Sequence, residues 1–424
     1  MPPEYPQVLL QNRKPDRIAT LEEYQQSGGY QALADVLKNY SYKDLQEILI
    51  EAVLLGRGGA AFPAGMKLRT VAEDAPFPRY LVCNADEMEP GTFKDRVLIH
   101  ADPHMIIEGM IIDGYGALAE KGIIFIRPEY ESAARILERE IKIAKKAGFL
   151  GKNILDSEFS MDIVVHRSGG RYICGEVTAQ LNALMGKRPN PQQPPPYPTE
   201  KGLWGMPTVL QNVETLANIP HIIRNGVEWY KNLAKTETGA GTKLFCVSGK
   251  VNKPGCFELP MGVRLSEIIE VHAGGMPAGS EYKACLPGGA STRYLPKEFY
   301  DIEMDFDPMR EAGHRLGTGA IMVFDQNTCL VGATLNLTEF FARESCGWCT
   351  PCREGLPYIR DLLLRVEEGE GREEFIPMLQ QMSKHLWSSY CAFAPGATSP
   401  VESLITYFED EVREHIAQKR CPFK

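Results

Sequence analysis

Three cysteines in the last quarter of the chain are spaced for binding a metal cluster. Cys346, Cys349 and Cys352 lie in the sequence CGWCTPC, so two residues separate each thiol from the next. Iron–sulfur clusters are bound by cysteine thiolates in runs of this spacing, together with a more distant cysteine. Structural zinc more often takes separated CxxC pairs or mixed cysteine and histidine ligands. Zinc, and a group of reduced cysteines without a metal, are kept as the alternatives. The spacing therefore predicts an iron–sulfur cluster.

The fourth ligand is predicted to be Cys391. It ends a helical segment, and Phe393, Pro395 and Gly396 after it are expected to form a loop that turns back over the cluster. Cys421 fits less well, because it lies in a charged tail that is expected to fray. The six other cysteines lie in apolar or turn contexts, where cysteine is usually a small buried hydrophobe: Cys83, Cys174, Cys246, Cys256, Cys285 and Cys329.

Three loops in the first half of the chain carry residues suited to binding a ligand. They are GRGGAAFPAGMK from Gly56, NADEMEPGTFKDR from Asn84 and HRSGGRYICGEVTAQL from His166. Any one of them alone is most simply a solvated turn, but their combination favours a binding site. Carboxylates could accept hydrogen bonds there, and glycines allow close backbone approach; these residues are Asp86, Glu87, Glu89, Gly169, Gly170 and Gly175.

The ligand of these loops is not predicted to be held as in an ordinary dinucleotide-binding dehydrogenase. No GxGxxG motif follows a strand, since the glycine-rich loop at Gly56 follows a helix. A phosphorylated aromatic cofactor fits better, with backbone amides, Arg57 and Lys67 near its phosphate. Asn84 is placed to hydrogen-bond the edge of its ring.

The loops are positioned by a pattern of alternating strands and helices. Short apolar runs are predicted as strands and longer periodic segments as helices, which indicates a βαβαβ unit with a parallel sheet. The predicted order is helix 42–55, strand 79–83, helix 103–118, strand 122–126, helix 131–147 and strand 161–165. The loops at Asn84 and His166 then leave the carboxyl ends of two strands, where ligands bind in open α/β sheets. Another helix is predicted to start at Asn212.

The second half of the chain no longer shows the alternation of strands and helices. A linker-like stretch at 235–243 precedes a strand pair, a short helix and further strands, which predicts a small α+β domain. From residue 335 the sequence is helical, with breaks expected at Gly347 and Pro351, and its apolar periodicity predicts a helix bundle. The proline-rich stretch 190–198 could bind a protein as polyproline, but an ordered loop lining the ligand site is favoured.

Composition narrows the class of protein. The net charge of −9 disfavours nucleic acid as a ligand, because phosphate backbones are bound by clustered Lys and Arg. The start of the sequence lacks the apolar core of a signal peptide, and no run of apolar residues is long enough to span a membrane. Cysteines arranged for a metal imply a reducing compartment. Any membrane association is therefore expected to occur through partner proteins.

Five motifs carry a resemblance to a known family. GRGGAAFPAGMK, NADEMEPGTFKDR, GGRYICGE, QNVETLANIP and ESCGWCTPCREG occur in this order, with Cys391 downstream. Over residues 10–420 the chain resembles the NADH-binding flavoprotein subunit of respiratory complex I. The resemblance implies three domains: a helical segment and Rossmann-like α/β FMN domain in 1–240, a ubiquitin-like β-grasp domain in 241–330, and a C-terminal four-helix bundle with a 4Fe-4S cluster in 331–424.

The resemblance also implies roles for individual residues. Those expected to hold FMN are Gly56, Arg57, Gly58, Gly59, Lys67, Asn84, Asp86, Glu87, Tyr172, Gly175, Glu176, Asn212 and Thr215. Glu89 is expected beside the nicotinamide and ribose of NADH, Phe62 near the adenine, and Tyr197 stacked on a base. Because the cofactors do the chemistry, Glu89 is expected to orient the nucleotide and no side chain is expected to act as an acid or base.

The implied activity is that of an NADH:quinone oxidoreductase. FMN would accept hydride from NADH, and the 4Fe-4S cluster would pass single electrons toward quinone. The implied partners are a thioredoxin-like subunit with a 2Fe-2S cluster and a larger iron–sulfur subunit, and the implied location is cytoplasmic, at the inner face of the cell membrane. Two alternatives stay open: a diaphorase of a hydrogenase or formate dehydrogenase, and a non-enzymatic structural subunit.

The sequence departs from the family pattern near the expected nucleotide site. Val177 follows Gly175 and Glu176, where the family usually has a second glutamate. That carboxylate would repel the ribose phosphate of NADPH, so its absence predicts weaker discrimination against NADPH. Smaller departures are Gln211 in place of asparagine, Pro194 in place of lysine and Tyr197 in place of phenylalanine.

Overall fold

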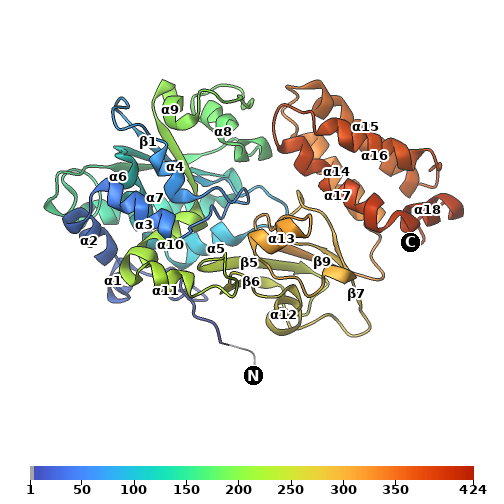
Figure 1. The fold of residues 1–424 in the computed structure, drawn as a ribbon, viewed down its shortest axis with the longest axis horizontal. Helices are drawn as coiled ribbons and strands as arrows, with labels where there is room; N and C mark the ends of the chain where they lie inside the picture. Colours follow the sequence, from blue (N-terminus) through green and yellow to red (C-terminus); the bar gives the residue numbers. More distant parts are fainter. Residues whose placement is uncertain (1–3) are drawn as a thin grey trace.

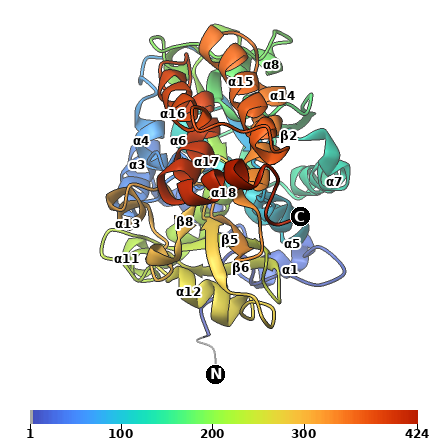
Figure 2. The same cartoon turned by 90° about the vertical axis from the view of Figure 1, so that its right-hand side faces the viewer.

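A computed structural model describes residues 4–424 (Figure 1). An α/β region forms from the first half of the chain, a second sheet follows it, and the C-terminal helices gather on one side of the molecule, as Figures 1 and 2 show. Among the described residues, none of the helices is both long and apolar enough to cross a membrane.

The first sheet is parallel throughout. Its strand order is β3-β2-β1-β4, and the strands are β1 (Tyr80–Ala85), β2 (Lys121–Ile126), β3 (Asp162–Arg167) and β4 (Thr208–Asn212). The connecting helices are α6 (Pro103–Ala117), α7 (Glu131–Lys146) and α8 (Val177–Leu184). The predicted βαβαβ unit is therefore confirmed, and β4 is an additional strand that the sequence pattern did not indicate.

Helix α10 (Val213–Asn225) begins where the sequence predicts, because Asn212 caps it. The Asn212 side chain accepts a hydrogen bond from the backbone N–H of Glu214 at 3.1 Å, which satisfies a donor that the first turn leaves free. The neighbouring short helices are α9 (Pro198–Lys201) and α11 (Val227–Lys231).

Five further helices lie between the N-terminal segment and α6: α1 (Leu21–Gln26), α2 (Gln31–Asn39), α3 (Tyr42–Glu51), α4 (Ala64–Arg69) and α5 (Lys94–Ala101). Helix α3 starts at a capping box in which Ser41 and Asp44 bond each other's backbone N–H groups. It ends earlier than predicted, since Val53 has a φ of 53°, a left-handed conformation that stops the helix. The chain then enters the glycine-rich loop.

The second sheet is mixed, with strand order β6-β5-β9-β7-β8. Strand β5 lies antiparallel to β6 and parallel to β9. The strands are β5 (Thr242–Gly249), β6 (Gly255–Pro260), β7 (Tyr282–Leu286), β8 (Leu295–Pro296) and β9 (Ala320–Asp325), and the helices are α12 (Leu265–Glu267), which continues as one turn to His272, and α13 (Phe306–Glu311). Strand pair, helix and further strands occur in the predicted order.

Buried polar contacts join the α/β region to the second sheet. Glu214 of α10 accepts a hydrogen bond from the backbone N–H of Leu244 at 2.8 Å and pairs with Lys243 at 3.2 Å. Glu258 of β6 accepts the backbone N–H groups of residues 8–10 at 2.9–3.0 Å. All three charged side chains are buried.

The C-terminal helices are α14 (Leu330–Glu344), α15 (Thr350–Glu367), α16 (Phe375–Leu386), α17 (Phe393–Tyr407) and α18 (Glu409–Gln418). Gly347 separates α14 from α15 as predicted. Pro351 does not break a helix, because it lies in the first turn of α15, where its missing N–H costs no hydrogen bond. The loop predicted after Cys391 is wrong, since α17 begins at Phe393.

Candidate cofactor cavity and cysteine pocket

A cavity of about 400 Å³ lies at the carboxyl ends of the first sheet's strands. Its walls combine the glycine-rich, acidic and β3–α8 loops with residues of the loops that connect the strands of the second sheet and with the start of α17. The predicted cofactor-binding residues that line it are Gly58, Gly59, Asn84, Asp86, Glu87, Glu89, Tyr172, Gly175, Glu176 and Asn212. The three loops chosen from the sequence thus meet at one site.

A buried ion network forms one wall of the cavity. The ammonium of Lys94, which is 1% exposed, lies 2.6 Å from Asp95, 3.1 Å from Glu214 and 2.9 Å from the amide oxygen of Asn212. Asn212 also donates to Asp95 at 2.7 Å. A Cβ at Gly58 would approach the Asn212 side chain to 3.2 Å, so glycine lets this loop lie close to the network without displacing that side chain.

The acidic loop offers an unused acceptor to the cavity. Asp86 accepts the Ser168 hydroxyl at 2.7 Å through Oδ1, whereas its buried Oδ2 has no hydrogen-bond partner among residues 4–424. Burial raises the pKa of Asp86 to about 6. An acceptor of this kind suits the hydroxyl groups of a ribityl chain. The cavity's size, glycine-rich rim and free acceptor therefore fit FMN.

Glu87 stabilises the loop rather than presenting both carboxylate oxygens to a ligand. It accepts hydrogen bonds from the backbone N–H of Asp95 at 2.9 Å and from the Tyr130 hydroxyl at 3.0 Å. Burial, and then the charge of Asp95, raise the pKa of Glu87.

Glu89 connects the α/β region to the second sheet across the cavity. Its Oε2 accepts the Tyr172 hydroxyl at 2.6 Å, and its Oε1 accepts the backbone N–H of Ser291 at 2.6 Å. Burial raises the pKa of Glu89. The carboxylate is therefore held in one orientation at the cavity wall, as an orienting group requires.

The structure places six predicted residues outside the cavity lining: Gly56, Arg57, Phe62, Lys67, Tyr197 and Thr215. The Arg57 guanidinium points into the core, donating to the carbonyl of Ala240 at 2.7 Å, and the Arg57 N–H donates to Thr215 at 2.9 Å. Lys67 donates to the carbonyl of Leu210 at 2.7 Å. Arg57 and Thr215 therefore fix the glycine-rich loop, while Phe62 and Tyr197 are exposed at 50% and 57%.

Several lining residues were missed by the sequence reasoning. Thr92, Lys94 and Asp95 belong to the acidic motif, so the motif itself could have indicated them. Ala60, Met88 and Ile173 likewise lie within the three motifs. Phe393 and Gly396, expected over the cysteine cluster, also line this cavity. The remaining residues come from distant segments that carry no local signal: Gly288, Ser291, Arg315, Gly317, Thr318 and Ala392.

The four predicted cluster ligands, Cys346, Cys349, Cys352 and Cys391, line a single small pocket. Burial raises the pKa of Cys352 to about 12, and the neighbouring thiols add to the effect. Four thiols held together in this way, one buried and three half-buried, fit an iron–sulfur cluster, which binds them as thiolates. Ile173 and Phe393 line both this pocket and the larger cavity, so the two sites share a wall.

The proline-rich loop lies against the cysteine pocket and not against the larger cavity. Pro191 lines the pocket, and the Gln193 amide donates to the carbonyl of Tyr390 at 3.1 Å, next to Cys391. The predicted ordered loop thus borders the cysteine site.

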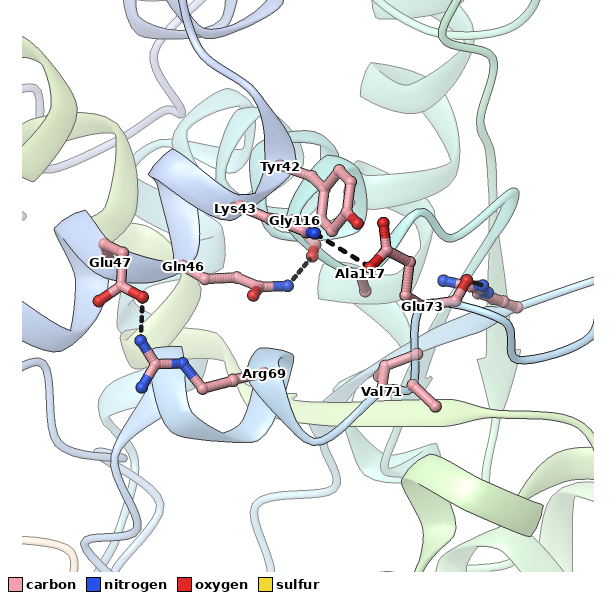
Figure 3. Close-up of a pocket in the computed structure, with 11 residues that line it drawn as sticks. Tyr42, Lys43, Gln46, Glu47, Arg69, Val71, Glu73, Gly116 and Ala117 are labelled. Atoms are coloured by element: carbon pink, nitrogen blue, oxygen red, sulfur yellow. Dashed lines mark hydrogen bonds and ion pairs between the residues drawn. The ribbon is translucent and has the colours of Figure 1, made fainter.

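Another hollow, of about 290 Å³, lies between α3, α4 and the end of α6 (Figure 3). Its charged side chains largely pair with one another: Lys43 lies 3.0 Å from Glu73, and Arg69 contacts Glu47. Gln46 donates to the carbonyl of Gly116 at 2.9 Å. These side chains serve the fold and leave little free hydrogen-bonding capacity for a ligand.

Three family models match the chain. They are described as the Nuo51 FMN-binding domain, over residues 49–221, the SLBB domain, over 244–293, and the NADH-ubiquinone oxidoreductase-F iron-sulfur binding region, over 332–415. The second of these matches falls on the second sheet, and the third contains all four cysteines of the pocket.

Known proteins resemble the chain over most of its length. The F subunit of NADH-quinone oxidoreductase from Escherichia coli is 47% identical over 94% of this chain and 90% of its own length. The corresponding F 2 subunit from Rhizobium meliloti is 44% identical over 98% of this chain and 99% of its own length. The crystal structure of an NAD+-reducing [NiFe]-hydrogenase in the H2-reduced state is 32% identical with a TM-score of 0.82, over 97% of this chain and 67% of that one. The chain therefore belongs to the family of NADH-quinone oxidoreductase F subunits.

Proposed function

We propose that the chain is the NADH-oxidising subunit of an NADH:quinone oxidoreductase. The main support for this proposal is the wall that the two sites share. Ile173 and Phe393 separate a cavity that fits FMN from a pocket of four cysteines. When bound, FMN accepts hydride from NADH, and the 4Fe-4S cluster passes single electrons onward to quinone carriers. The residues of the chain fix the distance between these sites and exclude water from the wall between them.

The residues have distinct positioning roles. Gly58 and Gly59 let the backbone approach the flavin, and Asn84, Asp86 and Asn212 supply hydrogen bonds. Glu89 orients the nucleotide, because Tyr172 and Ser291 hold its carboxylate. The cluster ligands are Cys346, Cys349, Cys352 and Cys391.

The proposed domains are a helical segment and Rossmann-like domain in 1–240, a ubiquitin-like β-grasp domain in 241–330 and a four-helix bundle in 331–424. The mixed sheet with order β6-β5-β9-β7-β8, together with the short helices α12 and α13, supports the β-grasp assignment. Helices α14 to α17 support the bundle, because each packs against the next and α17 packs back against α14.

The proposed partners are a thioredoxin-like subunit with a 2Fe-2S cluster and a larger iron–sulfur subunit. Through them the chain would lie in the cytoplasm at the inner face of the cell membrane. A hydrogenase-linked diaphorase is the second candidate, favoured by the likeness to the NAD+-reducing [NiFe]-hydrogenase. Co-purification from native membranes distinguishes the two by the attached redox subunits.

An anaerobic visible and EPR spectrum of protein purified with FMN and iron supplied tests the proposal. On adding NADH, we expect the flavin absorbance to bleach and the EPR signal of a reduced four-iron cluster to develop. Protein that holds zinc at the four cysteines and takes up no flavin would overturn it.

Replacing Glu89 by glutamine tests its orienting role. The amide is isosteric but neutral, so it loses the charge-assisted bonds to Tyr172 and Ser291. We expect the affinities for NADH and NAD+ to change by about tenfold, with FMN and iron contents equal to wild type. Titration of both nucleotides against flavin absorbance measures this. Unchanged affinities for both nucleotides would contradict the role.

Replacing Val177 by glutamate tests nucleotide selectivity. Val177 lines the cavity at the start of α8, so a glutamate there places a negative charge at the cavity wall. We expect the ratio of kcat/KM for NADH over NADPH to rise about tenfold, because the carboxylate repels the additional phosphate. Val177→Gln, of similar shape without the charge, is the matched control and is expected to leave the ratio near wild type. A wild-type ratio already as high as that of the glutamate variant would refute the prediction.

A further inference from the structure

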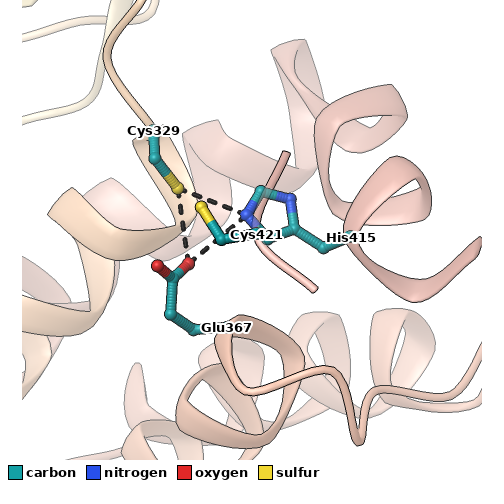
Figure 4. Close-up of side chains that lie close together, drawn as sticks. All are labelled: Cys329, Glu367, His415 and Cys421. Carbon is teal, nitrogen blue, oxygen red and sulfur yellow. Dashed lines mark hydrogen bonds and ion pairs between the residues drawn. The ribbon is translucent and has the colours of Figure 1, made fainter. Parts of the chain in front are cut away.

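A group of four metal-binding side chains lies outside the cofactor sites, at the junction of the C-terminal helices (Figure 4). Cys329 caps the start of α14, Glu367 ends α15, His415 lies on α18, and Cys421 follows α18. One ligand atom from each side chain lies within 4.8 Å of all the others. Cys421 is only 4% exposed, so the prediction that its segment frays is wrong, and Cys329 is not merely an apolar core residue.

The spacing of these atoms suits a tetrahedral ion. Zinc bonds to sulfur at about 2.3 Å and to nitrogen or oxygen at about 2.0–2.2 Å, which places tetrahedral ligand atoms roughly 3.3–3.8 Å apart. Cys329 Sγ lies 3.3 Å from His415 Nε2 and 3.4 Å from Glu367 Oε2. His415 Nε2 lies 3.3 Å from Glu367 Oε2.

Further contacts hold the ligands in place. His415 Nδ1 lies 2.7 Å from the carbonyl oxygen of Glu411, so a proton on Nδ1 donates to that oxygen and leaves the Nε2 lone pair free for a metal. Glu367 Oε1 pairs with Lys424 at 2.7 Å, and the backbone N–H of Gly332 donates to Cys329 Sγ at 3.1 Å. Outer contacts of this kind are typical of built metal sites.

Charge and ligand type select the ion. Two thiolates and one carboxylate carry three negative charges, which a divalent ion together with the Lys424 ammonium balances. Mixed sulfur, nitrogen and oxygen ligands at tetrahedral spacing favour zinc, and two thiolates are too few for the four-cysteine ligation of an iron–sulfur cluster. We propose that Cys329, Glu367, His415 and Cys421 bind one structural zinc ion that fastens α18 and the segment after it to α14 and α15.

Zinc analysis combined with X-ray absorption on the cofactor-loaded full chain tests the proposal. The probe is zinc supplied during expression together with iron and FMN, followed by extensive dialysis. We expect one zinc per chain, with two sulfur ligands and two nitrogen or oxygen ligands at the bond lengths given above. Zinc bound by four sulfurs would place it at the cluster cysteines and overturn the proposal, as would protein without zinc.

Variants provide an independent measurement. Cys421→Ser and His415→Ala are expected to lower the zinc content at least about tenfold while iron and FMN stay at wild-type levels. Cys285→Ser, which alters a buried cysteine of β7 that is not one of the four ligands, is the matched control and keeps its zinc. Zinc retained in both site variants, or a disulfide between Cys329 and Cys421 found by peptide mapping, would overturn the proposal. If a variant fails to fold, the X-ray absorption spectrum of the wild-type protein still shows whether zinc is bound by two sulfur ligands and two nitrogen or oxygen ligands.

Discussion

Replacing Cys349 by alanine is expected to abolish electron transfer to quinone while NADH oxidation at the flavin continues. The variant removes one of four thiols in the pocket, so the cluster loses a ligand and its affinity falls steeply. We expect NADH-driven quinone reduction in the assembled complex to fall at least about 100-fold. NADH oxidation by ferricyanide, which takes electrons directly from flavin, should stay within about threefold of wild type. Iron analysis and both assays on the same membranes measure the separation.

The matched control for this prediction is Cys285→Ala. Cys285 is a fully buried cysteine that packs in the core of the second sheet among apolar side chains. It should retain its iron and both activities. Equal iron content in the Cys349 and Cys285 variants would contradict the assignment of Cys349 as a ligand, and equal loss of both activities would mean that the substitution disrupts the fold.

Replacing Lys94 by methionine is expected to destabilise the chain by about 3–5 kcal/mol and to release FMN. The substitution keeps most of the apolar stem but leaves the carboxylates of Asp95 and Glu214 without their shared cation. Asn212 also loses a partner at the cavity wall. Urea unfolding of the FMN-loaded protein gives the stability change, and the flavin content after gel filtration gives the cofactor change.

Two further variants sharpen this test. Lys43→Met breaks a pair with Glu73 whose side chains are 59% and 72% exposed, and it should cost less than about 1 kcal/mol. Adding Asp95→Asn to Lys94→Met removes one of the stranded charges, so part of the lost stability should return. Equal unfolding midpoints for the Lys94 and Lys43 variants would show that the buried network does not stabilise the fold.

The fold could be predicted where buried residues recur at the regular spacing of a strand or a helix, so that apolar side chains form a clear pattern in the sequence. The strands β1 to β3 and the helices α6 and α7 lie within a few residues of their predicted bounds, because apolar runs and amphipathic helices alternate there. Helix α5, which starts inside the acidic motif, was missed. Strand β4 was missed, since five residues between a glycine-rich turn and a helix cap carry too little pattern. The proline and glycine at the start of α17 indicate a loop, yet Pro395 lies in the first turn of the helix, where proline is tolerated.

The candidate site was predictable only where its residues lie in one local motif. Asn84, Asp86 and Glu89 belong to one loop, and this loop lines the cavity. Arg57 is expected there because an arginine in a glycine-rich loop suits a phosphate. Its direction depends on the distant carbonyl of Ala240, which the local sequence does not indicate. The contact between Glu89 and Ser291 joins residues 202 positions apart, so it can be identified only from the folded structure.

Two buried contacts join the α/β region to the second sheet, between Glu214 and Lys243 and between Glu258 and the backbone of residues 8–10, and they are expected to couple the unfolding of the two parts. Cutting the chain near residue 240 would strand one charge of the first pair and expose backbone donors that the second contact satisfies. The α/β region and the second sheet are therefore expected to melt as a single cooperative unit. A fragment that ends between them is not a separable module, although the sequence there looks like a linker.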